Sequence, residues 1–279
     1  MKATLFLVPT PIGNLADITE RAKETLSSVD LIACEDTRTT QKLLGLLAIK
    51  TEASFVSYHE YNADKMRPVL LEKLSAGKNI ALVSDAGTPL ISDPGYRLVR
   101  DVLEADFSVI PLPGANAVLP ALQLSGLASD RFLFNGFLPS KKSARKTELE
   151  TLKNVPATLI FYESPHRVIE TLTDILEILG DRQSALVREL TKKFEESRRG
   201  LVSELLNYYQ ENGEPKGEVV LLVARTSGKM HSQQYNVNEL LKDALKKYNT
   251  VRDAVDAVTQ QTGLDRRKIY KQAVEIKNE

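Results

Sequence analysis

The sequence has few of the side chains that form covalent cross-links or bind metal ions. One cysteine, Cys34, is present among 279 residues, so an intrachain disulfide is excluded and a reducing compartment is expected. The three histidines, His59, His166 and His231, are widely separated and form no ligand set with the cysteine. A magnesium site made only of carboxylates stays open, but no motif supports one, and we expect no metal.

Long apolar runs and an excess of charge of one sign are also absent. The apolar run at residues 4–8 is too short for a signal peptide, and no run approaches the length of a transmembrane helix. Lys and Arg together number 37, as do Asp and Glu, so net charge attracts neither nucleic acid nor a membrane. We therefore expect a cytoplasmic protein without membrane contact, in which any RNA site comes from locally clustered cations.

Three motifs of common nucleotide-binding proteins and hydrolases are missing as well. No G-x-G-x-x-G follows the first apolar run, and neither a G-x-x-x-x-G-K-[ST] loop nor a G-x-S-x-G elbow occurs. The first half instead alternates strand and helix patterns, which predicts a mostly parallel sheet covered on both faces. The predicted strands are at 4–8, 31–34, 54–57, 79–83 and 108–112. Asp17 is the expected N-cap of the first helix.

The second half continues with a second set of strands and helices. Apolar runs at 132–137, 157–162, 184–187 and 218–223 predict a second α/β domain whose sheet is mixed in direction. We expect domains at 1–126 and 127–226, joined by the small and turn-forming residues 125–130. A composition break at 226–234 precedes a third part, 236–279, with helix, helix, glycine turn and basic helix. This helix-turn-helix pattern favours nucleic-acid contact, and the alternative is an appendage that packs or dimerises.

The loop Ser84–Pro94 is the densest group of turn-forming and polar residues in the chain. It follows a buried strand pattern, and four other loops, at 9–15, 35–40, 57–62 and 113–117, follow strands of the same predicted sheet. Because parallel strands end at one edge, these loops can line one crevice. Few cations are present there, so the crevice suits a polar, zwitterionic, nucleoside-like ligand better than a polyphosphate. The alternative is a set of plain strand-to-helix turns.

Five longer motifs occur in a fixed order and carry a family resemblance. They are VPTPIGNL at 8–15, EDTR at 35–38, SDAGTPLISDPG at 84–95, FYESPHR at 161–167 and RELTK at 188–192. With them the whole chain resembles the tetrapyrrole methylase superfamily, in its branch of bacterial small-subunit ribosomal RNA 2′-O-methyltransferases. The resemblance implies two α/β domains of the class III S-adenosyl-L-methionine (SAM) methyltransferase type with a small C-terminal helical module. It also implies SAM as cofactor, a homodimer, and methylation of a cytidine ribose in the decoding region of 16S rRNA in the small ribosomal subunit.

The resemblance also implies which residues hold the cofactor. The turn after the first strand and the Ser84–Gly95 loop would contact the methionine or ribose part, and second-domain residues would flank the adenine. The implied cofactor-binding residues are Pro11, Ile12, Gly13, Asp85, Ala86, Gly87, Thr88, Ser92, Ala115, Asn116, Phe161, Tyr162 and Val219.

The groups that carry the reaction and bind RNA are candidates chosen by residue type and position. A base that accepts the hydroxyl proton is expected among His59, Glu60, Asp36, Glu163 and His166, while both histidines could instead contact RNA or hold a loop. For Asp36 the alternative is a helix N-cap with an internal ion pair. Tyr58, Tyr61 and Tyr162 offer rings on which an unpaired base can stack. The RNA-binding candidates are Arg38, Lys141, Lys142, Arg145, Lys146, Arg167, Arg188, Lys192, Arg266 and Arg267.

Two other functions compete with ribose methylation of RNA. A tetrapyrrole C-methyltransferase would share the cofactor and fold, but a small macrocycle needs neither basic clusters nor a terminal helical module. A non-catalytic ribosome-assembly factor would use the same basic clusters without binding SAM.

Overall fold

Short apolar segments of the first half form one parallel sheet, as predicted. Its strands are β1 (Thr4–Leu7), β2 (Leu31–Cys34), β3 (Ser54–Ser57), β4 (Ile80–Val83) and β5 (Ser108–Pro111), in the order β3-β2-β4-β1-β5. All pairings are parallel, and β2 and β4 are buried at every residue. Strands buried on both faces need continuous apolar sequence, which is why these runs do not alternate.

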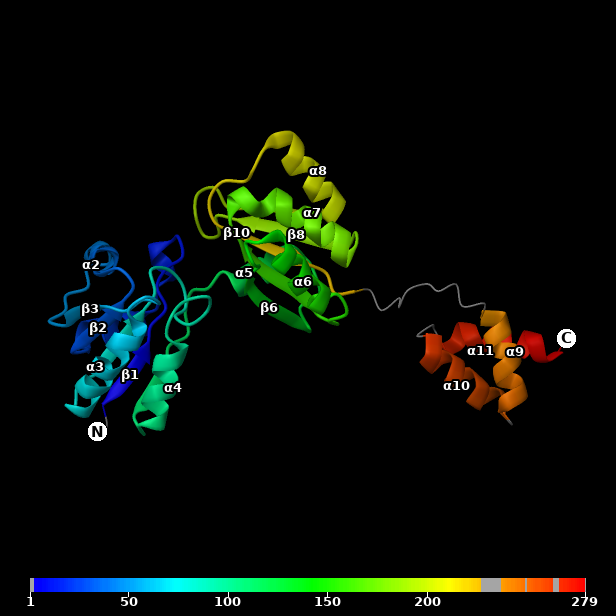
Figure 1. Ribbon diagram of the computed structural model, residues 1–279, viewed down its shortest axis with the longest axis horizontal. Helices are drawn as coiled ribbons and strands as arrows, with labels where there is room; N and C mark the ends of the chain where they lie inside the picture. The colour runs from blue at the N-terminus through cyan, green and yellow to red at the C-terminus, as the bar shows by residue number, and fades with distance from the viewer. Residues whose placement is uncertain (1–2, 227–236, 249, 263–265, 279) are drawn as a thin grey trace. The chain divides into compact units, whose positions relative to one another are not determined.

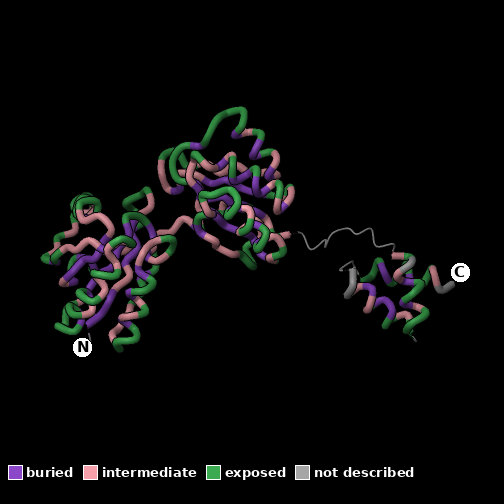
Figure 2. The backbone as a smooth tube through the Cα atoms, viewed as in Figure 1, coloured by how far each residue is buried: buried purple, intermediate pink, exposed green. Residues whose placement is uncertain are grey.

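The computed structural model describes residues 3–226, 237–248, 250–262 and 266–278 (Figure 1). The chain divides into two units, residues 1–153 with 158–224 and residues 154–157 with 225–279. Figure 2 shows buried backbone along the central strands of the first unit.

Helices cover both faces of the first sheet. Helices α1 (Glu20–Ser28) and α2 (Thr37–Leu46) contribute to one apolar cluster, and α3 (Ala63–Ser75) and α4 (Tyr96–Glu104) contribute to the other. The prediction that Asp17 caps α1 is wrong. Thr19 is the N-cap, and its Oγ1 accepts a hydrogen bond from Ala22 N at 3.1 Å, while Asp17 ends the 3-10 turn η1 (Leu15–Asp17).

The second sheet is mixed in direction, which confirms the prediction. Its order is β6-β7-β10-β8-β9, and β6 and β7 are parallel while the other neighbours are antiparallel. Strand β9, with the sequence ESRRGL, was not predicted because it has no apolar alternation. The strands are β6 (Phe132–Phe137), β7 (Thr158–Glu163), β8 (Gln183–Arg188), β9 (Glu196–Leu201) and β10 (Val219–Val223).

Five helical segments accompany the second sheet. Helix α5 (Val118–Ser125) packs its buried residues against β7, β8 and β10, so it belongs to the core of this sheet although it follows β5. Helix α7 (Val168–Leu179) contacts both α6 (Lys142–Leu152) and α8 (Val202–Asn212). The 3-10 turn η2 (Pro165–Arg167) leads into α7. The domain boundary expected at residue 126 stays a prediction.

Three C-terminal helices pack around a small apolar core of their own. They are α9 (Val237–Lys247), α10 (Val251–Thr262) and α11 (Arg266–Asn278), and each contacts the other two. Leu241, Val255 and Ile269 are almost fully buried between them. Residues 227–234 of the linker expected at 226–234, and the turn expected at Gly263, lie outside the described residues. Among the helices that the structure describes, none combines the length and apolarity needed to cross a membrane.

Candidate functional site

A cavity of about 430 Å³ lies where three loops of the first sheet meet the second sheet. The loops follow β1, β4 and β5, so the carboxyl edge of the parallel sheet forms one wall, as expected for this fold class. The other wall comes from the ends of β6 and β7 and the start of β10. Its volume lies within the range of about 300–1,000 Å³ that is common for small-ligand pockets.

Hydrogen bonds to backbone carbonyl groups tie the three loops together. Thr10 and Gly87 donate to each other's carbonyl oxygen, both at 2.9 Å, and Thr10 Oγ1 donates to Ser84 O at 3.1 Å. Thr88 Oγ1 donates to Ala115 O at 2.9 Å. Gly87 has φ +85°, and a Cβ there would lie 3.3 Å from Ile12 Cγ2. Glycine is therefore needed both for the backbone turn and for the close approach of the neighbouring loop.

Eight of the thirteen predicted cofactor-binding residues line this cavity. They are Ile12, Ala86, Gly87, Thr88, Ser92, Asn116, Tyr162 and Val219.

Five of the predicted residues do not line it. Gly13 packs against residues 190–192, and Ala115 contributes the carbonyl that binds Thr88. Phe161 is 0% exposed, because side chains alternate along β7 and its neighbour Tyr162 takes the cavity side. Pro11 and Asp85 complete the group, and Asp85 Oδ1 instead accepts from Asp36 N at 3.3 Å.

An aromatic cluster forms the second-sheet wall of the cavity. The Tyr162 ring lies edge-on to Phe134 and Phe137, with centroids 4.8 and 5.6 Å away. Burial, followed by the nearby Asp93 carboxylate, raises the pKa of Tyr162 to about 12, so its hydroxyl stays protonated at neutral pH. An apolar wall of this kind suits a planar ring.

Carboxyl groups gather at the opposite, loop side of the site. Burial raises the pKa of Asp93, a hydrogen bond with Ser84 opposes this, and Asp85 adds to the rise. Burial likewise raises the pKa of Glu35, with further rises from Asp93 and Asp85. Sequence reasoning missed Asp93, although it stands inside the Ser84–Pro94 loop. Within the described ranges, no three His, Cys, Asp or Glu side chains converge as metal ligands would.

Glu163 is the one of the five proton-acceptor candidates that lines the cavity. It is 3% exposed, accepts from Thr171 Oγ1 at 2.6 Å and Ser164 N at 2.8 Å, and lies 3.5 Å from Arg167 Nε.

The other four candidates, Glu60 among them, do not line the cavity. Asp36 caps α2 through the amides of Arg38 and Thr39 and pairs with the Arg38 side chain, which is the structural alternative considered for it. The ring of His59 packs edge-on to Tyr61. His166 Nδ1 lies 2.7 Å from Glu214 Oε2, and its ring is 85% exposed.

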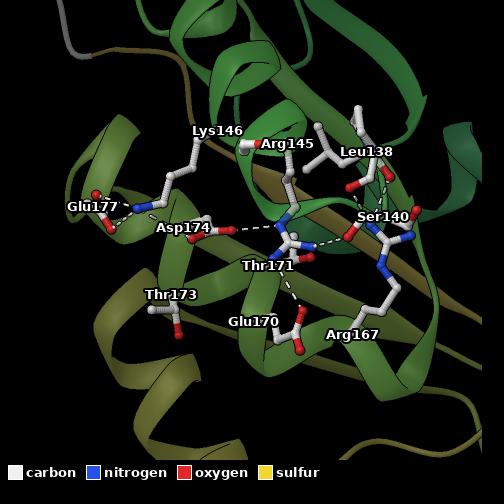
Figure 3. A network of polar contacts seen from close by, with 12 residues as sticks. Leu138, Ser140, Arg145, Lys146, Arg167, Glu170, Thr171, Thr173, Asp174 and Glu177 are labelled. Atoms are coloured by element: carbon white, nitrogen blue, oxygen red, sulfur yellow. Dashed lines mark hydrogen bonds and ion pairs between the residues drawn. The ribbon is translucent and has the colours of Figure 1, made fainter.

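Arg145 is the RNA-binding candidate that the structure contradicts. Its side chain is 1% exposed and is held between α6 and α7 (Figure 3). Its Nε donates to Asp174 at 2.7 Å, and its other nitrogens contact Ser140 O and Glu170, both at 3.3 Å. A guanidinium buried in this way cannot reach a phosphate, so Arg145 is structural.

The remaining cationic candidates differ in exposure and in their contacts within the chain. Arg38, Lys141, Lys142, Arg266 and Arg267 are exposed, and Arg38 pairs with Asp36. Arg266 and the other four candidates make ion pairs or carbonyl contacts within the chain. Those pairs are Lys146 with Glu177, Arg188 with Glu196, Lys192 with Glu189 and Glu218, and Arg266 with Asp256, while Arg167 donates to Leu138 O and Pro139 O.

Comparison with known families and relatives identifies what the chain is similar to. The family model described as "Tetrapyrrole (Corrin/Porphyrin) Methylases" matches residues 4–206. A protein of Mesorhizobium japonicum named ribosomal RNA small subunit methyltransferase I is 46% identical over 279 residues, which is 100% of this chain and 94% of the relative. The protein of the same name from Bacillus subtilis is 45% identical over 272 residues, covering 95% of this chain and 92% of the relative.

Two solved structures share the fold at low sequence identity. A diphthine synthase superposes with a TM-score of 0.59 at 13% identity, over 80% of this chain and 91% of that one. A Thermus thermophilus uroporphyrin-III C-methyltransferase complexed with S-adenosyl homocysteine has a TM-score of 0.55 at 18% identity, over 80% and 97%.

We expect Arg145→Met to lower the free energy of unfolding by about 3–5 kcal/mol, because it leaves the Asp174 carboxylate buried without its partner. Lys153→Met, at the end of the same helix, breaks an exposed pair with Glu150 at 3.7 Å and should change the free energy of unfolding by about 0–1 kcal/mol. The double variant Arg145→Met, Asp174→Leu should recover most of the loss. Urea unfolding measures all three, and equal stability of the two single variants would contradict the burial argument.

We expect Glu35→Gln to stabilise the protein at pH 7.5 but not at pH 4. The pKa of Glu35 is raised on folding, so its charged form is disfavoured in the native state. Below the unfolded pKa of about 4.3 both states are protonated and the residue has no effect. The destabilisation develops as pH rises from there through the folded pKa. Urea unfolding midpoints at both pH values test this, and Glu72→Gln, at an exposed position, is the control. A higher stability of Glu35→Gln at pH 4 alone would contradict the expectation.

Proposed function

The chain belongs to the tetrapyrrole methylase family, in the group of ribosomal RNA small subunit methyltransferases I, and we propose that it methylates RNA. The reaction proposed is transfer of the methyl group of SAM to the ribose 2′-hydroxyl of a cytidine in the decoding region of 16S rRNA. The observation that carries the proposal is the cavity at the carboxyl edge of the first sheet, in a chain that the family model matches over 4–206.

The cavity lining suits SAM in both shape and charge. The apolar surfaces of Tyr162, Phe137 and Val219 offer a wall for the adenine. The hydroxyls of Thr88 and Ser92 offer hydrogen bonds to the polar groups of SAM. The ionisable residues that line the cavity are acidic, apart from the phenol of Tyr162. Acidic lining complements the positive sulfonium and ammonium groups of SAM, whereas it would repel a polyphosphate.

The protein's contribution to the reaction is binding and alignment. When bound, SAM supplies an activated methyl group, so no covalent intermediate with the protein is needed. Holding the hydroxyl in line with the methyl carbon removes much of the entropic barrier. A group that accepts the hydroxyl proton adds a factor of about 10²–10⁴.

Exposed cations and the C-terminal helices support an RNA substrate. Lys141 and Lys142 stand exposed at the start of α6, and Arg267 is exposed on α11. Helices α9–α11 lie outside the span matched by the family model, yet inside the span shared with the Mesorhizobium japonicum relative. The helical module is therefore shared with a relative named for ribosomal RNA and is not part of the methylase family model. We extend the proposal to a homodimer in the cytoplasm, as the sequence resemblance implies.

A methyl-transfer assay tests this function. Tritiated SAM is incubated with the protein and either immature small ribosomal subunits or a uroporphyrinogen, and the labelled product is isolated. We expect label in 16S rRNA at a cytidine whose 3′ linkage resists alkali, as a 2′-O-methyl group requires. Label in the porphyrinogen alone would favour the tetrapyrrole C-methyltransferase, and absence of SAM binding would favour a non-catalytic assembly factor.

We expect Gly87→Val to weaken SAM binding about tenfold or more, equal to about 1.4 kcal/mol. A valine at φ +85° strains the loop, and its side chain meets Ile12 at the cavity wall. Gly45→Ala in α2 is the control, because a Cβ there meets nothing within 4 Å. Calorimetry with SAM, at a temperature where both variants are folded, measures the difference. Equal affinity for the two variants would place SAM elsewhere.

A further inference from the structure

A second cavity, of about 440 Å³, adjoins the first one and shares two consecutive residues with it. These residues are Ser92 and Asp93, which line both cavities. The second cavity is otherwise formed by the start of α4 and by residues around the start of α3. Because Ser92 and Asp93 face both spaces, a ligand in the second cavity lies beside a ligand in the first.

The segment that separates the two cavities has a strained backbone. Leu90 and Ser92 are non-glycine residues with φ +74° and +65°, and Gly95 has φ +135°. A Cβ on Gly95 would lie 2.9 Å from side-chain carbons of both Leu82 and Leu90. Strain of this kind costs about 1–3 kcal/mol per residue and persists mainly where function requires the geometry. Here it holds Asp93 between the two spaces.

The lining of the second cavity is polar and carries groups that suit a nucleotide. Tyr96 is 69% exposed, and an exposed ring provides a face on which an unpaired base stacks. The Arg97 side chain is 65% exposed and lies 3.5 Å from Asp64. Asp64 is held more closely by Arg67, at 2.8 Å, so Arg97 can turn to a phosphate without leaving that carboxylate alone.

We propose that the second cavity receives the acceptor nucleotide of a single-stranded RNA. In this arrangement Tyr96 stacks on the base, Arg97 contacts a phosphate, and the Asp93 carboxylate accepts the proton of the ribose hydroxyl. The inference rests on the proposed function, since it takes the first cavity as the SAM site.

The proton and electron movements balance with these groups alone. The hydroxyl oxygen forms a bond to the methyl carbon while its proton passes to the Asp93 carboxylate. The bond from that carbon to sulfur breaks, and its electron pair stays on sulfur. Asp93 then releases the proton to water, which restores the carboxylate.

Asp93, which is half-buried, is better suited to this step than the buried carboxylate of Glu163. Glu163 is committed to Thr171 and Ser164 and lines the first cavity, whereas Asp93 lines both. Burial also raises the pKa of Asp93, and a carboxylate with a raised pKa is a stronger base at neutral pH.

Asp93→Asn tests the catalytic role. We expect kcat with small ribosomal subunits to fall by about 10²–10⁴-fold. Because Asp93 also lines the first cavity, affinity for SAM, measured by calorimetry, should fall, but far less than kcat measured at saturating SAM. Affinity for RNA, measured by fluorescence anisotropy, should stay unchanged, and retained SAM binding also shows that the variant is folded. Wild-type kcat in this variant would overturn the role of Asp93.

Arg97→Gln and Tyr96→Ala test the cavity independently of that residue. Affinity for a labelled single-stranded RNA oligonucleotide containing cytidine should fall about 5- to 150-fold for Tyr96→Ala, with Tyr96→Phe restoring it. Arg97→Gln should lower the affinity and reduce the salt slope by about one. Arg100→Gln is the matched control, because Arg100 lies on the same helix, pairs with Glu104 and stands outside the cavity.

The two proposals fail in different ways. If the wild-type protein labels no ribosomal RNA, the proposed function fails. The oligonucleotide affinities then test separately whether the second cavity binds RNA. A larger loss of RNA affinity in Tyr96→Ala and Arg97→Gln than in Arg100→Gln supports an RNA site in the second cavity. Equal affinity in all three variants overturns it.

Discussion

Two reciprocal hydrogen bonds between Thr10 and Gly87 hold the site together. They join the loops after β1 and β4, which are neighbouring strands whose connections would otherwise diverge beyond the sheet edge. Once these loops are joined, Ile12 lies against Gly87, and Thr88 reaches the carbonyl of Ala115 in the loop after β5. Every loop that lines the first cavity from the parallel sheet is therefore positioned by hydrogen bonds to main-chain carbonyl groups. The Asn116 side chain holds the start of α5, since its Oδ1 accepts from Leu119 N at 3.0 Å.

The charged groups of the molecule divide by whether their charges are compensated. Arg145 and Asp174 are both 1% exposed, yet each faces an opposite charge at 2.7 Å, which is the arrangement of a structural pair. Glu35 and Asp93 are raised in pKa by burial and by like charges, and both stand at the carboxyl edge of the first sheet. Uncompensated carboxylates beside a strained loop lower stability, and such features concentrate at binding and catalytic sites.

Sequence patterns predicted the parts of the structure that depend on local apolar periodicity. The parallel sheet, the mixed sheet and the three terminal helices follow from runs that must be buried. Strand β9 was missed because its ESRRGL sequence is polar and its pairing with β8 is tertiary. Arg145 was misassigned because one cation in a basic run gives no sign of an Asp174 located 29 residues away. Asp93 was passed over because its position between two cavities depends on the left-handed turn at Ser92.

The fold alone does not select the acceptor. A diphthine synthase and a uroporphyrin-III C-methyltransferase share it at 13% and 18% identity, although their names refer to different compounds. We therefore propose that selection comes from surfaces beside the first cavity rather than from the sheet edge itself. In this chain those surfaces carry Tyr96 and Arg97 next to Asp93, and exposed lysines at the start of α6. Because Ser92 and Asp93 line both cavities, our two proposals make the Ser84–Pro94 loop the place where donor binding and acceptor choice are coupled.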